Sequence, residues 1–113
     1  MRLVTFEHDG RRAVGALRGD DEVVDLRFPG DMVAFVAGGD HALAWAASKL
    51  ARPEGDVHAL ADARLRAPLV PPVILNSGQN YWDHRDEKPP VDQKDPEFFL
   101  KTPLAVIGPD EPV

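Results

Sequence analysis

The chain has 113 residues, of which 43% are hydrophobic and 28% charged, with a formal net charge of −6 and no cysteine. This composition supports a packed core, and it excludes disulfides, thiolate catalysis and cysteine-ligated metal sites. The acidic balance gives no electrostatic footprint for nucleic acid or for an anionic membrane. Met1 leads directly into a short polar stretch that does not resemble a signal peptide, and residues 32–50 carry glycines and charges that exclude a bilayer span, so we expect a cytoplasmic protein.

The first 26 residues predict three short strands. Apolar and polar residues alternate over residues 2–7, and Asp9-Gly10 is typical of a tight hairpin turn. A second strand is expected over residues 13–17, and a third over residues 22–26 after a turn at residues 19–21. We therefore expect a small antiparallel meander at the start of the chain.

Two helices are expected next. Asp31 is a suitable N-cap for a helix that contains Phe35, and the glycine pair at 38–39 ends or interrupts that helix. Asp40 is expected to cap a second helix that runs to about Ala51, with its small and apolar residues on one face.

Residues 57–65 are compatible with two structures. Their apolar residues alternate, which favours a strand, whereas their alanine content favours a helix; the alternation continues toward Pro68, so we favour the strand. Prolines at positions 68, 71 and 72 then mark a boundary between two patterned stretches. We predict a small N-terminal α+β domain over residues 1–69 and the start of a second domain over residues 70–113.

The second stretch shows a broken pattern of short apolar runs. In chain order we expect a strand at 73–75, a polar loop at 76–80, a short helix at 81–87, an exposed loop at 88–96, and strands at 98–100 and 104–108. These strands are too few to close a core by themselves. The chain is therefore expected to be part of a longer protein or to pair with a partner.

The histidine at position 84 is the main candidate for chemistry. On a helix, His84 and Glu87 would lie one turn apart, and a carboxylate beside an imidazole prepares it to take a proton from water. The simpler alternative is a chance pair on a charged helix, and the other three histidines are expected to be structural or solvated. Lys101 ends an apolar run, so it presents its charge either to a cleft or to solvent.

Residues 74–113 resemble the opening of the catalytic domain in the fumarylacetoacetate hydrolase family. The family pattern is Gly-x-Asn-Tyr-x-x-His, a loop with prolines, Phe-Leu-Lys-Pro and a run that ends in Ile-Gly-Pro. This chain has Gly78 to His84, then Phe99-Leu100-Lys101-Thr102-Pro103, then Val106 to Pro109. Thr102 and the glutamine at position 79 depart from the usual pattern. The earlier residues resemble the N-terminal extension of the family less specifically, through Val23 to Leu26 and Ala67-Pro68-Leu69.

The resemblance implies an α+β chain whose second part begins a mixed, β-rich catalytic domain that is incomplete here. It implies a catalytic dyad of His84 and Glu87 on a lid at residues 84–96, and substrate contacts at Gln79, Asn80, Tyr81 and Lys101. It also implies Mg or Mn as cofactor, held by a Glu-x-Glu pair and a later Asp that lie beyond Val113, a small oxo-acid substrate and a homodimer.

The function expected from the resemblance is metal-dependent hydrolysis or lysis of C–C bonds in 2-oxo or diketo acids, with the dyad activating water. This 113-residue stretch alone is then expected to be inactive. The alternative is a catalytically silent binding or dimerisation module that keeps only the opening segment of the family.

Overall fold

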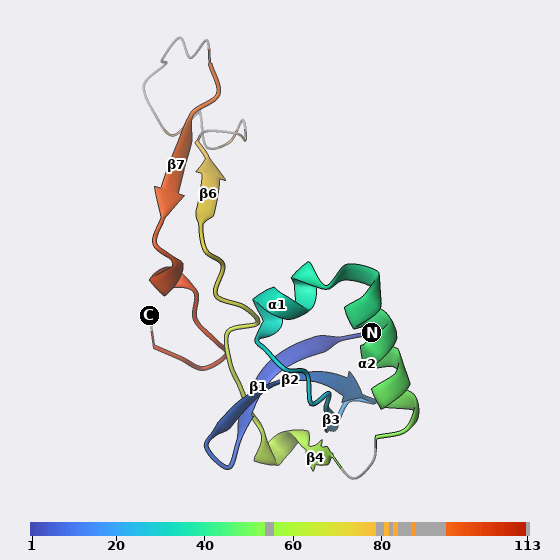
Figure 1. Cartoon of the computed structure of the whole chain (residues 1–113). Helices are drawn as coiled ribbons and strands as arrows, with labels where there is room; N and C mark the ends of the chain where they lie inside the picture. Colours follow the sequence, from blue (N-terminus) through green and yellow to red (C-terminus); the bar gives the residue numbers. More distant parts are fainter. Residues whose placement is uncertain (54–55, 79–80, 82, 84–86, 88–94, 113) are drawn as a thin grey trace. The chain divides into compact units, whose positions relative to one another are not determined.

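The computed structural model describes residues 1–53, 56–78, 81, 83, 87 and 95–112. The fold is mixed α+β, with seven strands and two α-helices among the described residues. The chain divides into two compact units. The first unit comprises Met1–Val70 together with Val106–Val113, and the second unit comprises Pro71–Ala105 (Figure 1).

The predicted meander is confirmed at the start of the first unit. Strands β1 (Leu3–His8), β2 (Arg11–Arg18) and β3 (Glu22–Asp25) pair in antiparallel order. The β1–β2 turn is made by Asp9 and Gly10, which both adopt a positive φ, of 50° and 74°. Two successive positive φ values match the right-handed twist of the strands that the turn joins, which is why Asp-Gly suits this position.

Residues 57–65, whose sequence was compatible with a strand or a helix, form two short strands around a 3-10 turn. Strand β4 (Val57–Ala59) pairs with β3, and β5 (Arg64–Leu65) pairs with β1, with η1 (Leu60–Asp62) between them. The sheet order is β4-β3-β2-β1-β5, so one continuous segment reaches both edges of the sheet. The sheet is therefore curled, and the ring of His58 on β4 stacks on that of His8 on β1, with centroids 4.2 Å apart.

Both predicted helices are present in the first unit. Helix α1 (Met32–Ala37) begins after Asp31, whose side chain accepts a hydrogen bond from the Ala34 N–H, as predicted. Helix α2 (Gly39–Ala51) begins two residues earlier than expected. The prediction that Asp40 caps α2 is wrong: Gly38 is the N-cap, and Asp40 lies in the first turn, where its charge still favours the helix dipole.

The core lies between one face of the sheet and the two helices. Its buried residues are Val14, Ala16, Leu26, Met32, Phe35, Ala42 and Ala46. On the other face of the sheet, Phe6 and Val23 are fully buried. A Cβ at Gly15 would lie 2.8 Å from the Phe6 ring, so a larger residue at this position would displace that ring.

The second unit contains one hairpin and a 3-10 turn among its described residues. Strands β6 (Ile74–Ser77) and β7 (Phe98–Lys101) form a two-stranded sheet, the β6–β7 ribbon, followed by η2 (Pro103–Ala105). The β7 strand was predicted. The predicted loop at 76–80 is wrong at its start, because Asn76 and Ser77 belong to β6.

The strand predicted at residues 104–108 is also wrong. Residues 103–105 form η2, and residues 106–108 have no regular structure. Pro103 supplies no N–H for a strand ladder, and it stands where the apolar run begins. Within the described residues, no helix has the length and apolar content needed to cross a lipid bilayer.

Candidate functional site

The β6–β7 ribbon brings the two separated parts of the sequence motif together. Ser77 pairs with Phe98, and the Gly78 N–H donates to the Glu97 carbonyl oxygen at 2.8 Å. A Cβ at Gly78 would lie 3.2 Å from the Glu97 carboxylate, so glycine allows this close approach. The residues between Gly78 and Glu97, which include the dyad and lid of the sequence prediction, therefore connect two strands that are paired at their base.

Three of the predicted site residues lie outside the described residues: Gln79, Asn80 and His84. The lid at 84–96 and the helix at 81–87 also fall mainly on residues that are not described. Of the remaining residues, Tyr81 is 77% exposed and Glu87 lies exposed in a turn. The one-turn spacing of His84 and Glu87 therefore stays a prediction.

Lys101 lies at the end of β7 that is remote from this connection. It pairs with Ile74 and is exposed. Lys101 is three positions after Phe98, a distance of about 10 Å along a strand. The described residues thus place Lys101 on the same ribbon as the motif, but toward the opposite end of the strand.

Sequence reasoning missed Asn76, which shares a face of the ribbon with Lys101. Paired residues of an antiparallel sheet point to the same side, so Ile74, Lys101, Asn76 and Phe99 occupy one face. The Asn76 Nδ2 atom is shielded from solvent, and it has no hydrogen-bond partner among the described residues. Strand alternation from Ile74 would have placed this amide on the face of Ile74, had the predicted strand been extended by one residue beyond position 75.

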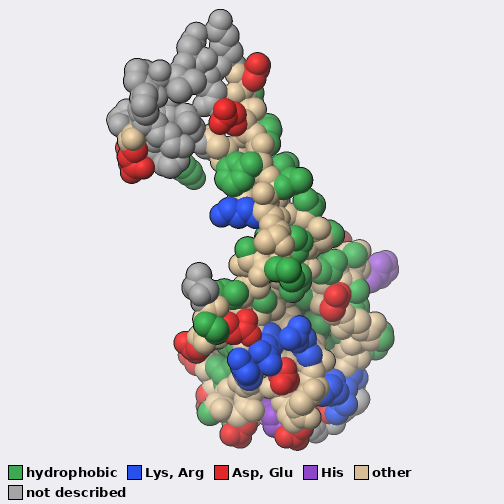
Figure 2. Space-filling view, turned by 90° about the vertical axis from the view of Figure 1, so that its left-hand side faces the viewer, with side chains coloured by type: hydrophobic (Ala, Val, Ile, Leu, Met, Phe, Trp, Pro, Cys, Tyr) green, Lys and Arg blue, Asp and Glu red, His purple; other side chains and the backbone are tan. Residues whose placement is uncertain are grey.

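The ribbon exposes large apolar side chains on both faces. Leu75, Phe98 and Leu100 share the other face and are 62%, 63% and 69% exposed. Hydrophobic side chains of the second unit are accordingly visible at its surface (Figure 2). Exposed apolar residues that cluster in this way are typical of surfaces that bind another polypeptide or a ligand.

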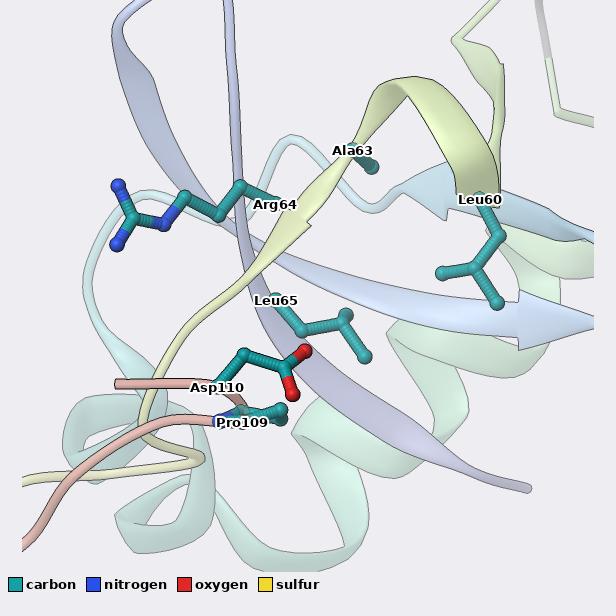
Figure 3. Close-up of a pocket in the computed structure, with 6 residues that line it drawn as sticks. All are labelled: Leu60, Ala63, Arg64, Leu65, Pro109 and Asp110. Carbon is teal, nitrogen blue, oxygen red and sulfur yellow. The ribbon is translucent and has the colours of Figure 1, made fainter. Parts of the chain in front are cut away.

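The first unit contains a pocket of about 290 Å³ at the β5 edge of its sheet. The pocket is lined by Leu60, Ala63, Arg64, Leu65, Pro109 and Asp110 (Figure 3). The Arg64 side chain extends away from those of Leu60 and Leu65 (Figure 3). Four of the six lining residues are apolar, and the two charged ones, Arg64 and Asp110, carry opposite charges. The lining therefore has no net positive charge for an anionic oxo acid, and it does not suit the predicted substrate.

Several charged groups of the first unit are paired with one another. The buried Asp25 carboxylate accepts hydrogen bonds from the Arg11 guanidinium and from the Arg27 N–H, and Arg27 also binds Asp56. The hydrogen bond from Arg27 lowers the pKa of Asp56, and that from Arg18 lowers the pKa of Glu22. These hydrogen bonds account for the positions of the charged groups that take part in them.

No group of three or more His, Asp or Glu side chains is arranged to hold a metal ion in the part of the chain that the structure describes. The polar side chains in the two described strands of the ribbon are those of Asn76, Ser77 and Lys101, and they include no carboxylate, the ligand that such hard cations prefer. The described residues thus do not fit the Mg or Mn ion that the sequence resemblance implies.

A comparison with known proteins finds a curated protein that is similar in sequence to part of this chain. Protein Rv2993c of Mycobacterium tuberculosis (strain ATCC 25618 / H37Rv) is 44% identical to it over 57 residues, which is 48% of this chain and 20% of that protein. The matched part of the chain therefore spans about a fifth of the length of this relative. No family model matches the chain.

Proposed function

We propose that this chain is the opening part of a metal-dependent hydrolase or lyase of the fumarylacetoacetate hydrolase family, acting on C–C bonds of 2-oxo or diketo acids. The observation that carries the proposal is the β6–β7 pairing, in which the residue before Gly-x-Asn-Tyr-x-x-His lies beside the first residue of Phe-Phe-Leu-Lys. Two motif segments that are distant in sequence are thereby neighbours in space, as parts of one site need to be.

His84 is the proposed general base, with Glu87 as the carboxylate that orients its imidazole. The imidazole takes a proton from water, and the resulting hydroxide adds to the carbonyl carbon distal to the 2-oxo acid. The C–C bond to the adjacent methylene then breaks, and its electron pair leaves as the enolate of the 2-oxo acid. Protonation of that enolate completes the reaction.

Substrate binding is assigned to donors that suit a carboxylate. The Lys101 ammonium and the unpartnered Asn76 amide lie on one face of the ribbon among the described residues, and both groups are able to donate hydrogen bonds to a carboxylate. Gln79, Asn80 and Tyr81 follow β6 directly and complete the proposed contacts. In a chain with a net charge of −6, such local donors are what an anionic substrate requires.

The divalent ion of the proposed family would polarise the oxo-acid oxygens, and it requires ligands other than those that the structure describes. The proposal therefore predicts that the present 113 residues are inactive alone.

A second candidate is a binding or dimerisation module without catalysis. The observation that favours it is the exposure of Leu75, Phe98 and Leu100 on one face of the ribbon. Such a module would need neither the imidazole of His84 nor a metal ion.

The test is turnover of an acylpyruvate by the complete gene product, with Mg²⁺ or Mn²⁺ supplied. His84→Ala is expected to lower kcat by at least about 100-fold with a smaller change in KM, because general-base catalysis contributes 10²–10⁴-fold. His41→Ala is the matched control, since His41 is exposed on α2, and it should leave kcat unchanged. Equal kcat in the His84→Ala variant and in the unchanged protein would refute the assigned role.

A further inference from the structure

The chain leaves and re-enters the first unit at two segments that touch each other. Residues 66–68 precede the excursion into the second unit, and residues 108–111 follow it. Gly108 is buried, and a Cβ built on it would lie 2.8 Å from the Ala67 nitrogen and from the Arg66 carbonyl carbon. Only glycine permits this backbone contact, so the departing and returning segments are in direct van der Waals contact.

Arg66 connects both segments to the sheet. Its Nη2 and Nε atoms donate to Glu7 Oε2 at 2.7 and 3.1 Å, and its Nη1 donates to Glu111 Oε1 at 2.8 Å. The Arg66 side chain is only 17% exposed. The rigid fork of a guanidinium can satisfy two carboxylates at once, which a lysine ammonium cannot do with the same geometry. We call this group of Arg66, Glu7 and Glu111 the clamp.

Further hydrogen bonds fix each segment within the first unit. The Arg66 N–H donates to the Thr5 carbonyl oxygen at 2.9 Å, and the Thr5 hydroxyl donates to the Pro68 carbonyl oxygen at 2.6 Å. On the returning segment, the Gly108 N–H donates to Glu111 Oε2 at 2.8 Å. The departing segment is thus held on β1, and the returning segment is held on Arg66.

The carboxylates of the clamp are held in their charged form. The Arg66 hydrogen bond lowers the pKa of Glu7, and the Gly108 N–H, followed by Arg66, lowers the pKa of Glu111. Basic and acidic side chains lie next to one another on the face of the first unit seen in Figure 2. Both carboxylates of the clamp therefore carry the negative charge that attracts the Arg66 guanidinium at neutral pH.

We propose that the clamp is a conformational coupling device, which makes the order of the β6–β7 ribbon depend on the first unit. A two-stranded sheet is marginally stable by itself, and β6 and β7 must find each other across the connection between them. Holding the two ends of the excursion together reduces the entropy that the chain loses when these strands pair. This inference concerns folding alone and does not rest on the proposed catalytic function.

The experiment is amide hydrogen exchange, residue by residue, on the whole 113-residue chain. Arg66→Lys keeps the charge but loses the fork, so exchange of the β6 and β7 amides should accelerate by about tenfold relative to those of β1 and β2. Arg64→Lys is the matched control, because Arg64 is 62% exposed and reaches Glu111 only at 4.0 Å, and it should leave the ratio unchanged.

Two further variants keep the proposal open to refutation should Arg66→Lys unfold the chain. Glu111→Gln leaves the Arg66–Glu7 contact intact, and Gly108→Ala separates the backbones without removing a charge. Both should accelerate ribbon exchange selectively. Unchanged ribbon exchange in these variants, or equal acceleration in both units, would overturn the proposal.

Discussion

The same residue type has opposite environments in the two units. Phe6 in the first unit is 0% exposed, whereas Phe98 in the second is 63% exposed. The first unit covers both faces of its sheet, with helices on one face and the curl of the sheet over the other. The two strands of the ribbon have no layer of the second unit described over them, so their alternating side chains cannot form a core. The first unit thus has a core of its own, whereas the described strands of the ribbon have none.

Truncating one phenylalanine in each unit should give the largest difference in unfolding free energy between the two units. Phe6→Ala removes a fully buried ring and is expected to lower the free energy of unfolding by about 3–5 kcal/mol. Phe98→Ala is the matched control and should change it by less than about 0.5 kcal/mol. Urea unfolding followed by circular dichroism measures both, and equal losses would contradict the contrast between the units.

The next largest effect is expected at Asp25, a charged group whose side chain is completely buried. Asp25→Ala removes the acceptor for Arg11 and for the Arg27 N–H, and we expect a loss of about 2–3 kcal/mol in unfolding free energy. Asp20→Ala removes an exposed partner of Arg2 and should cost almost nothing. A neutral result for Asp25→Ala in urea titration would show that the network adds no net stability.

Acid should weaken the first unit through four carboxyl groups. The pKa values of Glu7, Glu22, Asp56 and Glu111 are lowered, mainly by hydrogen bonds that they accept. A lowered pKa in the folded state contributes stability that is present above the ordinary value of about 4 and is lost as the pH falls through the folded value. The urea midpoint at low salt should therefore fall between pH 5 and pH 3. A midpoint that is constant over this range would contradict the assigned pairs.

The smallest predicted effect concerns Trp45, which joins α2 to the end of β3. Its Nε1–H donates to the Leu26 carbonyl oxygen at 3.0 Å. Trp45→Phe removes this donor and should lower the unfolding free energy by about 1 kcal/mol. Val36→Ala, at a 59% exposed position on α1, is the control and should stay within about 0.5 kcal/mol of the unchanged chain.

Local chemistry explains which parts of the fold the sequence could predict. The Asp9-Gly10 turn and the Asp31 cap depend on neighbouring residues, and both are confirmed. The division of residues 57–65 between two sheet edges depends on distant partners, so alternation alone could not locate the break at Leu60–Asp62. Residues 104–108 have the composition of a strand, but none of the described strands pairs with them, and Pro103 starts the run.

The candidate site was predictable only in part, for a similar reason. Motif spacing identifies the residues of the connection, but His84, Gln79 and Asn80 lie outside the described residues, so their geometry is untested. Asn76 was missed because its polar neighbours favoured a loop, whereas the pairing with Phe99 extends the strand. Pairing partners across a ribbon are not encoded in either strand alone.

Hydrogen exchange on the unchanged chain tests the contrast between the units most directly. Amides of β1, β2 and β3 should exchange only on global unfolding of the first unit, and those of β6 and β7 should exchange at least about tenfold faster through local opening. Equal protection of the ribbon and the curled sheet would contradict the account, because it would show that the ribbon is as stable as the core-bearing unit.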